Sequence, residues 1–436
     1  LGSKDTPPSS VFAIYKELEK DAPKSRFTIG IVDDVTNLSL ERGETPVTAP
    51  DSIVACKFWG LGADGTVGAN KNSIKIIGDH TDKYAQAYFD YDSKKSGGVT
   101  MSHLRFGKKP IKSTYLIHKA NFVACHNPSY VNKYNMVQEL VDGGTFLLNC
   151  AWDMEGLEKH LPGQVKAFIA NHNIKFYTID GVKIGIETGM GPTRINTILQ
   201  SAFFKLTGII PEEQAIDLMK AAAKATYGRK GDDVVQKNWA AIDAGAKQVV
   251  EIQVPESWKD AEDEGLHMTH ATEGRQDVID FVNNIQAKVN AQEGNSLPVS
   301  AFKDYVDGTT PSGSSAYEKR GIAVDIPVWQ SENCIQCNRC AYVCPHAVIR
   351  PVALTEDELA KAPEGTKAID MIGMPGMKFT MTVSAYDCTG CGSCANVCPG
   401  KKGAKALAME NLEANMGEQK FFDYGCNTST EGRRYR

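Results

Sequence analysis

The chain has 436 residues, 42% of them hydrophobic and 23% charged, which is globular composition with room for roughly two to four domains. Its 48 Lys and Arg against 53 Asp and Glu leave a formal charge of −5, a balance that argues against a dedicated nucleic-acid surface. No run approaches the roughly 18 apolar residues that cross a bilayer, and the polar start LGSKDTPPSS does not resemble a secretion signal. The sequence therefore predicts a soluble cytoplasmic protein that binds neither nucleic acid nor membrane.

The first fifty residues predict a short helix followed by a strand. Residues 9–20 (SSVFAIYKELEK) have apolar side chains at helical spacing, and residues 26–35 (RFTIGIVDDV) are rich in β-branched side chains. The Pro- and Thr-containing stretch GETPVTAPDS that follows is typical of a linker, so we place a domain boundary near residue 50.

Apolar strand-like runs then alternate with helical ones as far as residue 252. Strands are expected at 52–60, 85–92, 98–107, 113–118, 121–126, 145–152 and 175–180, and helices at 131–141, 164–171, 194–205, 211–224 and 232–252. This alternation predicts a three-layer α/β/α domain, and because several strands follow one another closely the sheet should be mixed.

Residues 255 to 326 are polar and irregular around one amphipathic helix at 275–289, which indicates a connector or a very small domain. The last hundred residues carry a strand-like segment, MKFTMTVSAYDC, between two short cysteine runs. Each run has the form C-x2-C-x2-C-x3-C-P, so this region is an internal repeat.

These runs contain eight of the 12 cysteines, at Cys334, Cys337, Cys340, Cys344, Cys388, Cys391, Cys394 and Cys398. In the bacterial two-cluster arrangement the cysteine before Pro ligates the other cluster. We therefore expect one [4Fe–4S] cluster on Cys334, Cys337, Cys340 and Cys398, and a second on Cys344, Cys388, Cys391 and Cys394. Structural zinc and disulfides are the alternatives, but zinc sites generally use two C-x2-C pairs.

The other four cysteines carry less information. Cys56, Cys125 and Cys150 lie in apolar runs, where a free cysteine acts as a small hydrophobic side chain. Cys426, in DYGCNTST, is either a ligand of another centre or an ordinary thiol.

A glycine-rich turn follows the first strand of the α/β domain. Gly60, Gly62 and Gly65 fit G-x-G-x-x-G between a strand and a helix, a context in which backbone amides bind a pyrophosphate. Asp79 or Asp82 could serve the ribose of a nicotinamide cofactor. The cations in YDSKKSGG instead suit coenzyme A, which carries an additional phosphate. Tight strand–helix packing and a solvated lysine turn are the structural alternatives.

Four strings occur in the order GLGADGTVGANKNSIKIIGD, YDSKKSGGVTMSHLRFG, YEKRGIAV and NCIQCNRCAYVCPHAVI. Together they closely resemble the single-chain pyruvate:ferredoxin (flavodoxin) oxidoreductases, or pyruvate synthases. The resemblance implies a coenzyme A-binding γ-type domain at 51–263, a small connecting domain at 264–325 that contains Glu318-Lys319-Arg320, and an α+β bacterial-type ferredoxin-like domain at 326–436. Residues 1–50 would be the end of a preceding domain.

The resemblance also implies cofactor sites. The family's coenzyme A contacts fall here on Gly62, Ala63, Asp64, Gly65, Thr66, Lys94, Asn196 and Asn238. The complete enzymes also use thiamine diphosphate, Mg²⁺ and a third [4Fe–4S] cluster, and the motifs for these groups are not found in this sequence. We therefore expect the central portion of a larger enzyme, with no catalytic residue for pyruvate of its own.

The implied reaction converts pyruvate, coenzyme A and oxidised ferredoxin to acetyl-CoA, CO2 and reduced ferredoxin. This chain would contribute coenzyme A binding and electron relay, with the remaining domains of a homodimeric enzyme and ferredoxin or flavodoxin as partners. The alternatives are a non-catalytic iron–sulfur subunit of another 2-oxoacid oxidoreductase and a nicotinamide-linked oxidoreductase.

Overall fold

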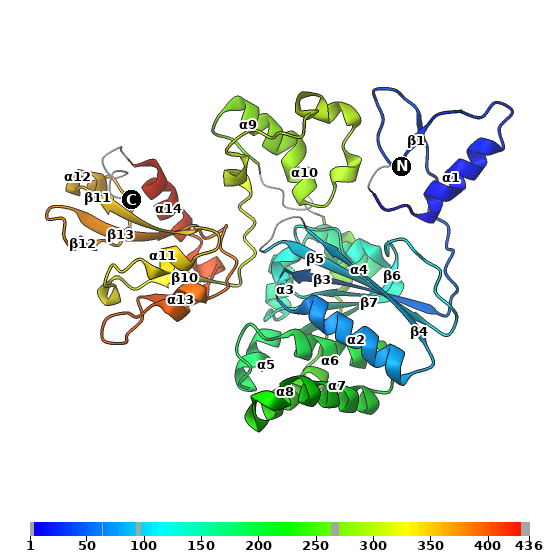
Figure 1. The fold of residues 1–436 in the computed structure, drawn as a ribbon, viewed down its shortest axis with the longest axis horizontal. Coiled ribbons are helices and arrows are strands. Elements are labelled where there is room, and N and C mark those ends of the chain that lie inside the picture. Colours follow the sequence, from blue (N-terminus) through cyan, green and yellow to red (C-terminus); the bar gives the residue numbers. More distant parts are fainter. Residues whose placement is uncertain (1–3, 63, 93–96, 263–269, 429–436) are drawn as a thin grey trace. The chain divides into compact units, whose positions relative to one another are not determined.

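The computed structural model describes residues 4–62, 64–92, 97–262 and 270–428. The chain divides into two compact units, Leu1–Ser315 and Ala316–Arg436, which are drawn in Figure 1. The finer division at about residues 50, 263 and 325 stays a prediction. In the described part of the chain, no helix has both the length and the apolar character that crossing a membrane requires.

The first unit is built on a seven-stranded sheet with the order β4-β5-β3-β6-β7-β8-β9. The strands are β3 (Ile53–Leu61), β4 (Tyr84–Tyr91), β5 (Val99–Gly107), β6 (Ala120–Cys125), β7 (Leu140–Asn149), β8 (Lys175–Ile179) and β9 (Val250–Glu251). Strands β3, β6, β7 and β8 are parallel, whereas β4, β5 and β9 pair antiparallel. The predicted mixed sheet is therefore confirmed.

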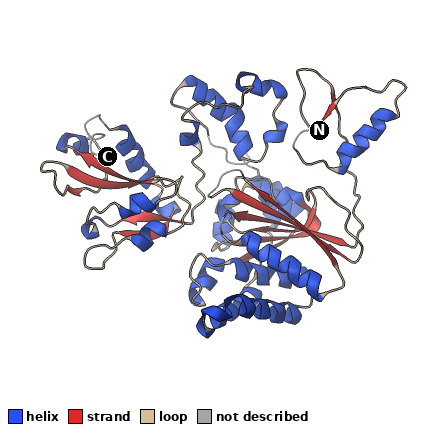
Figure 2. Ribbon diagram, viewed as in Figure 1, coloured by secondary structure: helices blue, strands red, loops and turns tan. Residues whose placement is uncertain are grey.

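Helices cover both faces of this sheet (Figure 2). On one face α2 (Thr66–His80), α6 (Asn196–Thr207), α7 (Glu212–Tyr227) and α8 (Asp232–Lys247) pack on alternate strand residues such as Phe58 and Phe122. On the other face α4 (Gly163–Asn171) packs with the 3-10 turn Glu256–Asp260, whose Trp258 lies 6.4 Å from the ring of Phe176. This arrangement confirms the predicted α/β/α layers.

Two predictions inside this unit are wrong. Residues 113–118 form no strand, because the carbonyls of Ser113 and Leu116 accept hydrogen bonds from the Arg105 guanidinium instead of joining the sheet. Residues 131–141 form turns and a 3-10 helix (Val137–Glu139) rather than an α-helix, and β7 begins at Leu140.

The boundaries of several other elements also differ from expectation. The last long helix stops at Lys247, so that β9 can pair with β8. Helices α3 (Met154–His160) and α5 (Gly181–Glu187) were not predicted, although Asp153 and Asp180 cap their first turns through Gly156 N–H and Lys183 N–H.

Two smaller segments complete the first unit. Helix α1 (Pro8–Leu18) matches the prediction, but the expected strand at 26–35 shortens to β1 (Thr28–Ile29), which pairs with β2 (Ser39–Leu40), because the Asp33 carboxylate folds the following residues into a turn. The helix expected at 275–289 is present as α9 (Gln276–Phe281) and α10 (Ala287–Asn290), joined by a π-helical turn.

The second unit is the expected α+β arrangement. Its antiparallel strand pairs are β10 (Asp325–Trp329) with β14 (Leu407–Asn411), and β13 (Lys378–Val383) with β11 (Ile349–Leu354) and β12 (Ile369–Asp370). Its helices are α11 (Arg339–Val343), α12 (Glu356–Ala360), α13 (Ser393–Val397) and α14 (Glu418–Asn427). The buried core of this unit includes Cys340, Cys388 and Cys394, so the cysteine loops belong to its packing.

Candidate electron-relay and coenzyme sites

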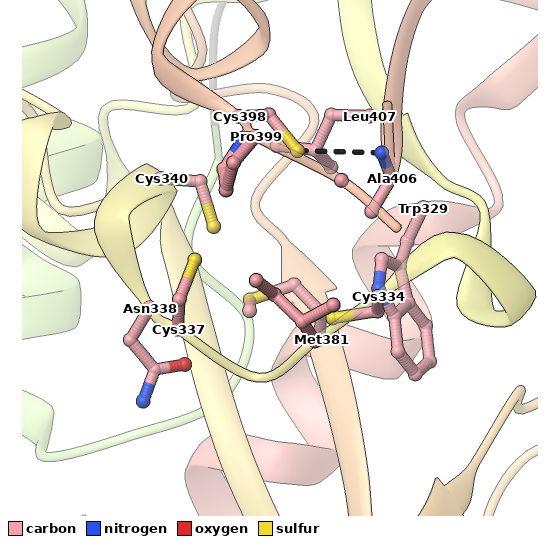
Figure 3. A pocket seen from close by; sticks show the side chains of 12 residues that line it. Trp329, Cys334, Cys337, Asn338, Cys340, Met381, Cys398, Pro399, Ala406 and Leu407 are labelled. Atoms are coloured by element: carbon pink, nitrogen blue, oxygen red, sulfur yellow. Dashed lines mark hydrogen bonds between the residues drawn. The ribbon is translucent and has the colours of Figure 1, made fainter. Parts of the chain in front are cut away.

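The second unit gathers the cysteines of the two runs into two groups of four. Cys334, Cys337 and Cys340 line one pocket together with Cys398 from the other run, beside Trp329 and Met381. Figure 3 shows the sulfurs of Cys337, Cys340 and Cys398 directed into this pocket. Cys344 lines a second pocket with Cys388, Cys391 and Cys394. Each group therefore takes three cysteines from one run and one from the other.

The two cysteine loops have the same backbone shape. Gln336 and Asn338 have left-handed φ values of 55° and 57°, and Gly390 and Gly392, at the equivalent places of the second run, have 70° and 70°. In each loop this turn points an N–H at the first sulfur: Gln336 N–H donates to Cys334 Sγ and Gly390 N–H donates to Cys388 Sγ, each at 3.4 Å. Hydrogen bonds from backbone amides to sulfur are typical of iron–sulfur ligands.

The donor chemistry of both groups fits a cubane cluster. A [4Fe–4S] cube needs four thiolates spread around it, and each of the two pockets is lined by four cysteines. Burial raises the pKa of the Cys340 and Cys388 thiols to about 12, so both thiols are protonated at neutral pH and would have to lose the proton to bind a metal. Cys426 lies on α14 near Arg350 and lines neither pocket.

The glycine-rich turn of the first unit joins β3 to α2. The antiparallel register places Leu61 opposite Val99, so that Gly62 N–H donates to Gly98 O at 2.7 Å. The Asp64 carboxylate accepts hydrogen bonds from Leu61 N–H at 2.8 Å and from Thr66 N–H at 2.7 Å. These two amides are therefore satisfied within the protein and are not the ones that a phosphate would meet.

A pocket of about 270 Å³ opens beside this turn, lined by Leu61, Gly62, Asp64, Gly65, Val67, Tyr91, Asp92, Gly98, Val99 and Thr100. Asn196, the first residue of α6, reaches the same turn, since a Cβ added at Gly65 would lie 3.1 Å from its side chain. The structure thus brings together Gly62, Asp64, Gly65, Thr66 and Asn196.

Three expected coenzyme contacts remain: two lie outside the described residues, and the third does not line the pocket. Ala63 and Lys94 lie outside the described residues. Asn238 is buried on α8, does not line the pocket, and donates from Nδ2 to Val234 O at 2.8 Å.

Comparison with known proteins finds family matches within both units. Residues 55–248 match the family described as pyruvate ferredoxin/flavodoxin oxidoreductase, residues 333–402 match the 4Fe-4S dicluster domain, and residues 269–323 match the EKR domain, described as being of unknown function. The chain is 53% identical over 415 residues to pyruvate:ferredoxin oxidoreductase of Moorella thermoacetica, covering 95% of this chain and 34% of that protein.

Similar matches link it to two pyruvate-flavodoxin oxidoreductases. The identity is 50% with the protein of Enterobacter agglomerans (98% of this chain, 36% of that protein) and 46% with that of Klebsiella pneumoniae (100% and 36%). The chain is homologous to a segment of the pyruvate:ferredoxin (flavodoxin) oxidoreductases. It spans about a third of the length of these relatives, and the resemblance deduced from the four strings is confirmed.

His126 lies at the glycine-rich turn, where the sequence analysis did not place it. Its Nδ1 lies 2.7 Å from Thr66 Oγ1, and because the Thr66 hydroxyl donates to Asp64 Oδ2 at 2.8 Å, His126 must donate its Nδ1–H to Thr66. Burial lowers the pKa of His126, and the nearby Asp64 carboxylate opposes this shift. The available signal was topological, since His126 directly follows β6 and parallel neighbours end at the same edge of a sheet.

Proposed function

We propose that this chain is the central portion of a pyruvate:ferredoxin oxidoreductase and supplies its coenzyme A site and two [4Fe–4S] clusters that relay electrons. The observation that carries the proposal is the grouping of eight cysteines into two pockets of four in one unit. The complete enzyme would convert pyruvate, coenzyme A and oxidised ferredoxin to acetyl-CoA, CO2 and reduced ferredoxin.

In this proposal the first cluster is held by Cys334, Cys337, Cys340 and Cys398, and the second by Cys344, Cys388, Cys391 and Cys394. Iron–sulfur clusters supply one-electron redox chemistry. The protein contributes the amide hydrogen bonds to Cys334, Cys388 and Cys398 sulfurs and a largely apolar surround, both of which tune reduction potentials.

The coenzyme A site is proposed at the pocket beside Gly62, Ala63, Asp64, Gly65 and Thr66. Gly65 has a left-handed φ of 91°, and an added Cβ would lie 3.1 Å from the Asn196 side chain, so a larger residue at this position would be strained and would crowd the turn. Lys94 would pair with a phosphate of the coenzyme. Asn238, on α8, would be a further contact of the coenzyme.

The rest of the reaction is assigned to parts of the enzyme beyond this segment. Thiamine diphosphate, Mg²⁺ and a third [4Fe–4S] cluster would be bound there, so this chain alone should not oxidise pyruvate. Its partners would be those domains within a homodimer, and ferredoxin or flavodoxin in the cytoplasm.

We expect anaerobic calorimetry of the 436-residue chain to detect one coenzyme A site and no NADH site. Lys94→Ala should weaken coenzyme A binding by about tenfold to a hundredfold, as expected for loss of a charged hydrogen bond. Lys95→Ala removes the same charge one residue away and should change the affinity much less.

Three results would contradict this account. Binding of NADH in place of coenzyme A would support a nicotinamide-linked enzyme, and binding of neither would support an electron-transfer subunit. Pyruvate oxidation by this chain with added thiamine diphosphate and Mg²⁺ would show that the segment is catalytically complete.

A further inference from the structure

The motif Glu318-Lys319-Arg320 lies within the match to the EKR domain, which is described as being of unknown function. In the structure the motif lies in the unit Ala316–Arg436, together with both cysteine loops. Lys319 has a left-handed φ of 36°, a conformation that L-residues adopt only at an energetic cost. Specific contacts must therefore hold Lys319 in this conformation.

These contacts fasten the motif to the residues that immediately precede Cys388. Lys319 Nζ donates to Asp387 Oδ2 at 2.6 Å and lies 3.3 Å from Ser384 Oγ. Gly321 N–H donates to Tyr386 O at 2.7 Å. The Lys319 and Asp387 side chains are 27% and 28% exposed, so solvent screens their interaction only in part.

The chain after the motif continues along the same cysteine loop. A Cβ added at Gly390, which lies between Cys388 and Cys391, would be 3.1 Å from Asp325 O and 3.4 Å from Ala323 Cβ. The segment from Lys319 to Asp325 therefore contacts the residues on both sides of Cys388.

The first cysteine loop has a different arrangement at the equivalent place. Cys334 follows Asn333, a neutral residue, whose Nδ2 donates to Lys405 O at 3.3 Å. The two loops share their backbone shape, but the residue before the first cysteine is charged and lysine-paired only in the second.

We propose that Lys319 is a positioning residue for the cluster on Cys344, Cys388, Cys391 and Cys394, where it also neutralises Asp387 and so raises the reduction potential of that cluster. Reduction adds one negative charge to a cluster, so a nearby cation favours the reduced form and an unpaired carboxylate opposes it. This inference rests on the ligand set given under Proposed function.

The test is a redox titration of the reconstituted 436-residue chain, followed by electron paramagnetic resonance. Lys319→Met should make reduction of one cluster about tenfold less favourable, a shift of about 59 mV to lower potential, and leave the other unchanged. Asp387→Asn should shift the same cluster to higher potential. The double variant should return towards the original value, and Lys319→Arg should retain it.

Lys420→Met is the matched control, because it removes a lysine of the same unit whose Nζ donates to Glu364 O. It should move neither potential. Two intact clusters with unchanged potentials in Lys319→Met and Asp387→Asn would overturn the inference, as would shifts of equal sign. If the Lys319→Met chain does not assemble its clusters, the potential shift in Asp387→Asn alone decides whether the inference holds. A reconstituted parent chain that holds only one cluster would instead contradict the proposed ligand sets.

Discussion

We expect a chain that carries both Cys344→Ala and Cys388→Ala to retain one [4Fe–4S] cluster, and a chain that carries both Cys344→Ala and Cys340→Ala to retain none. Cys344 lines the pocket of Cys388, Cys391 and Cys394 rather than the pocket of its own run. The first pair of substitutions therefore affects one pocket, whereas the second affects both.

Iron analysis distinguishes these outcomes, since the first double variant should hold about four iron atoms and the second almost none. Cys426→Ala, which removes a cysteine that lines neither pocket, should leave the iron content unchanged. The reverse pattern, with Cys344→Ala and Cys340→Ala retaining a cluster, would mean that each run ligates its own cluster.

Gly400→Ala should strongly destabilise the second unit. Gly400 has a φ of 59°, and an added Cβ would lie 1.7 Å from Ala404 O, where the chain folds back through paired backbone hydrogen bonds between Lys401 and Ala404. This clash adds to the backbone strain, so we expect the free energy of unfolding to fall by about 3–5 kcal/mol. Gly400 also lines the pocket of Cys398, so that cluster should be lost first.

Gly403→Ala is a control that introduces backbone strain without the steric clash expected at Gly400. Gly403 has a φ of 86°, but its added Cβ would meet no atom within 4 Å. It should cost only about 1–2 kcal/mol. Anaerobic denaturant titrations of both variants measure the difference in the free energy of unfolding. Equal losses of stability would show that the turn around Ala404 can shift to accommodate the added Cβ at little cost.

The two groups of cysteines could be predicted because the residues that define them are close together in the sequence. The spacing of each run sets three ligands on one loop, and the crossed assignment needs only the Cys-Pro that ends the other run. The strands β3 and β5 were predictable for a similar reason, since each is a short run bounded by turn residues: β5 is buried along its whole length and β3 along most of it.

Other features depend on contacts between distant residues and could not be predicted in this way. Tyr134 lies within the expected helix at 131–141, but its ring stacks on Trp59 at 5.3 Å, a contact that the local pattern does not encode. Lys319 and Asp387 are 68 positions apart, and His126 is 60 positions from Thr66. Only the topology reveals that these residues meet.

The most direct test of the account is Mössbauer spectroscopy, with iron and sulfide analysis, on the anaerobically reconstituted 436-residue chain. The account predicts about eight iron atoms and about eight sulfides per chain, all in [4Fe–4S] clusters, each of which takes up one electron on reduction. A chain that binds four iron atoms or fewer, or that binds zinc in their place, would contradict it.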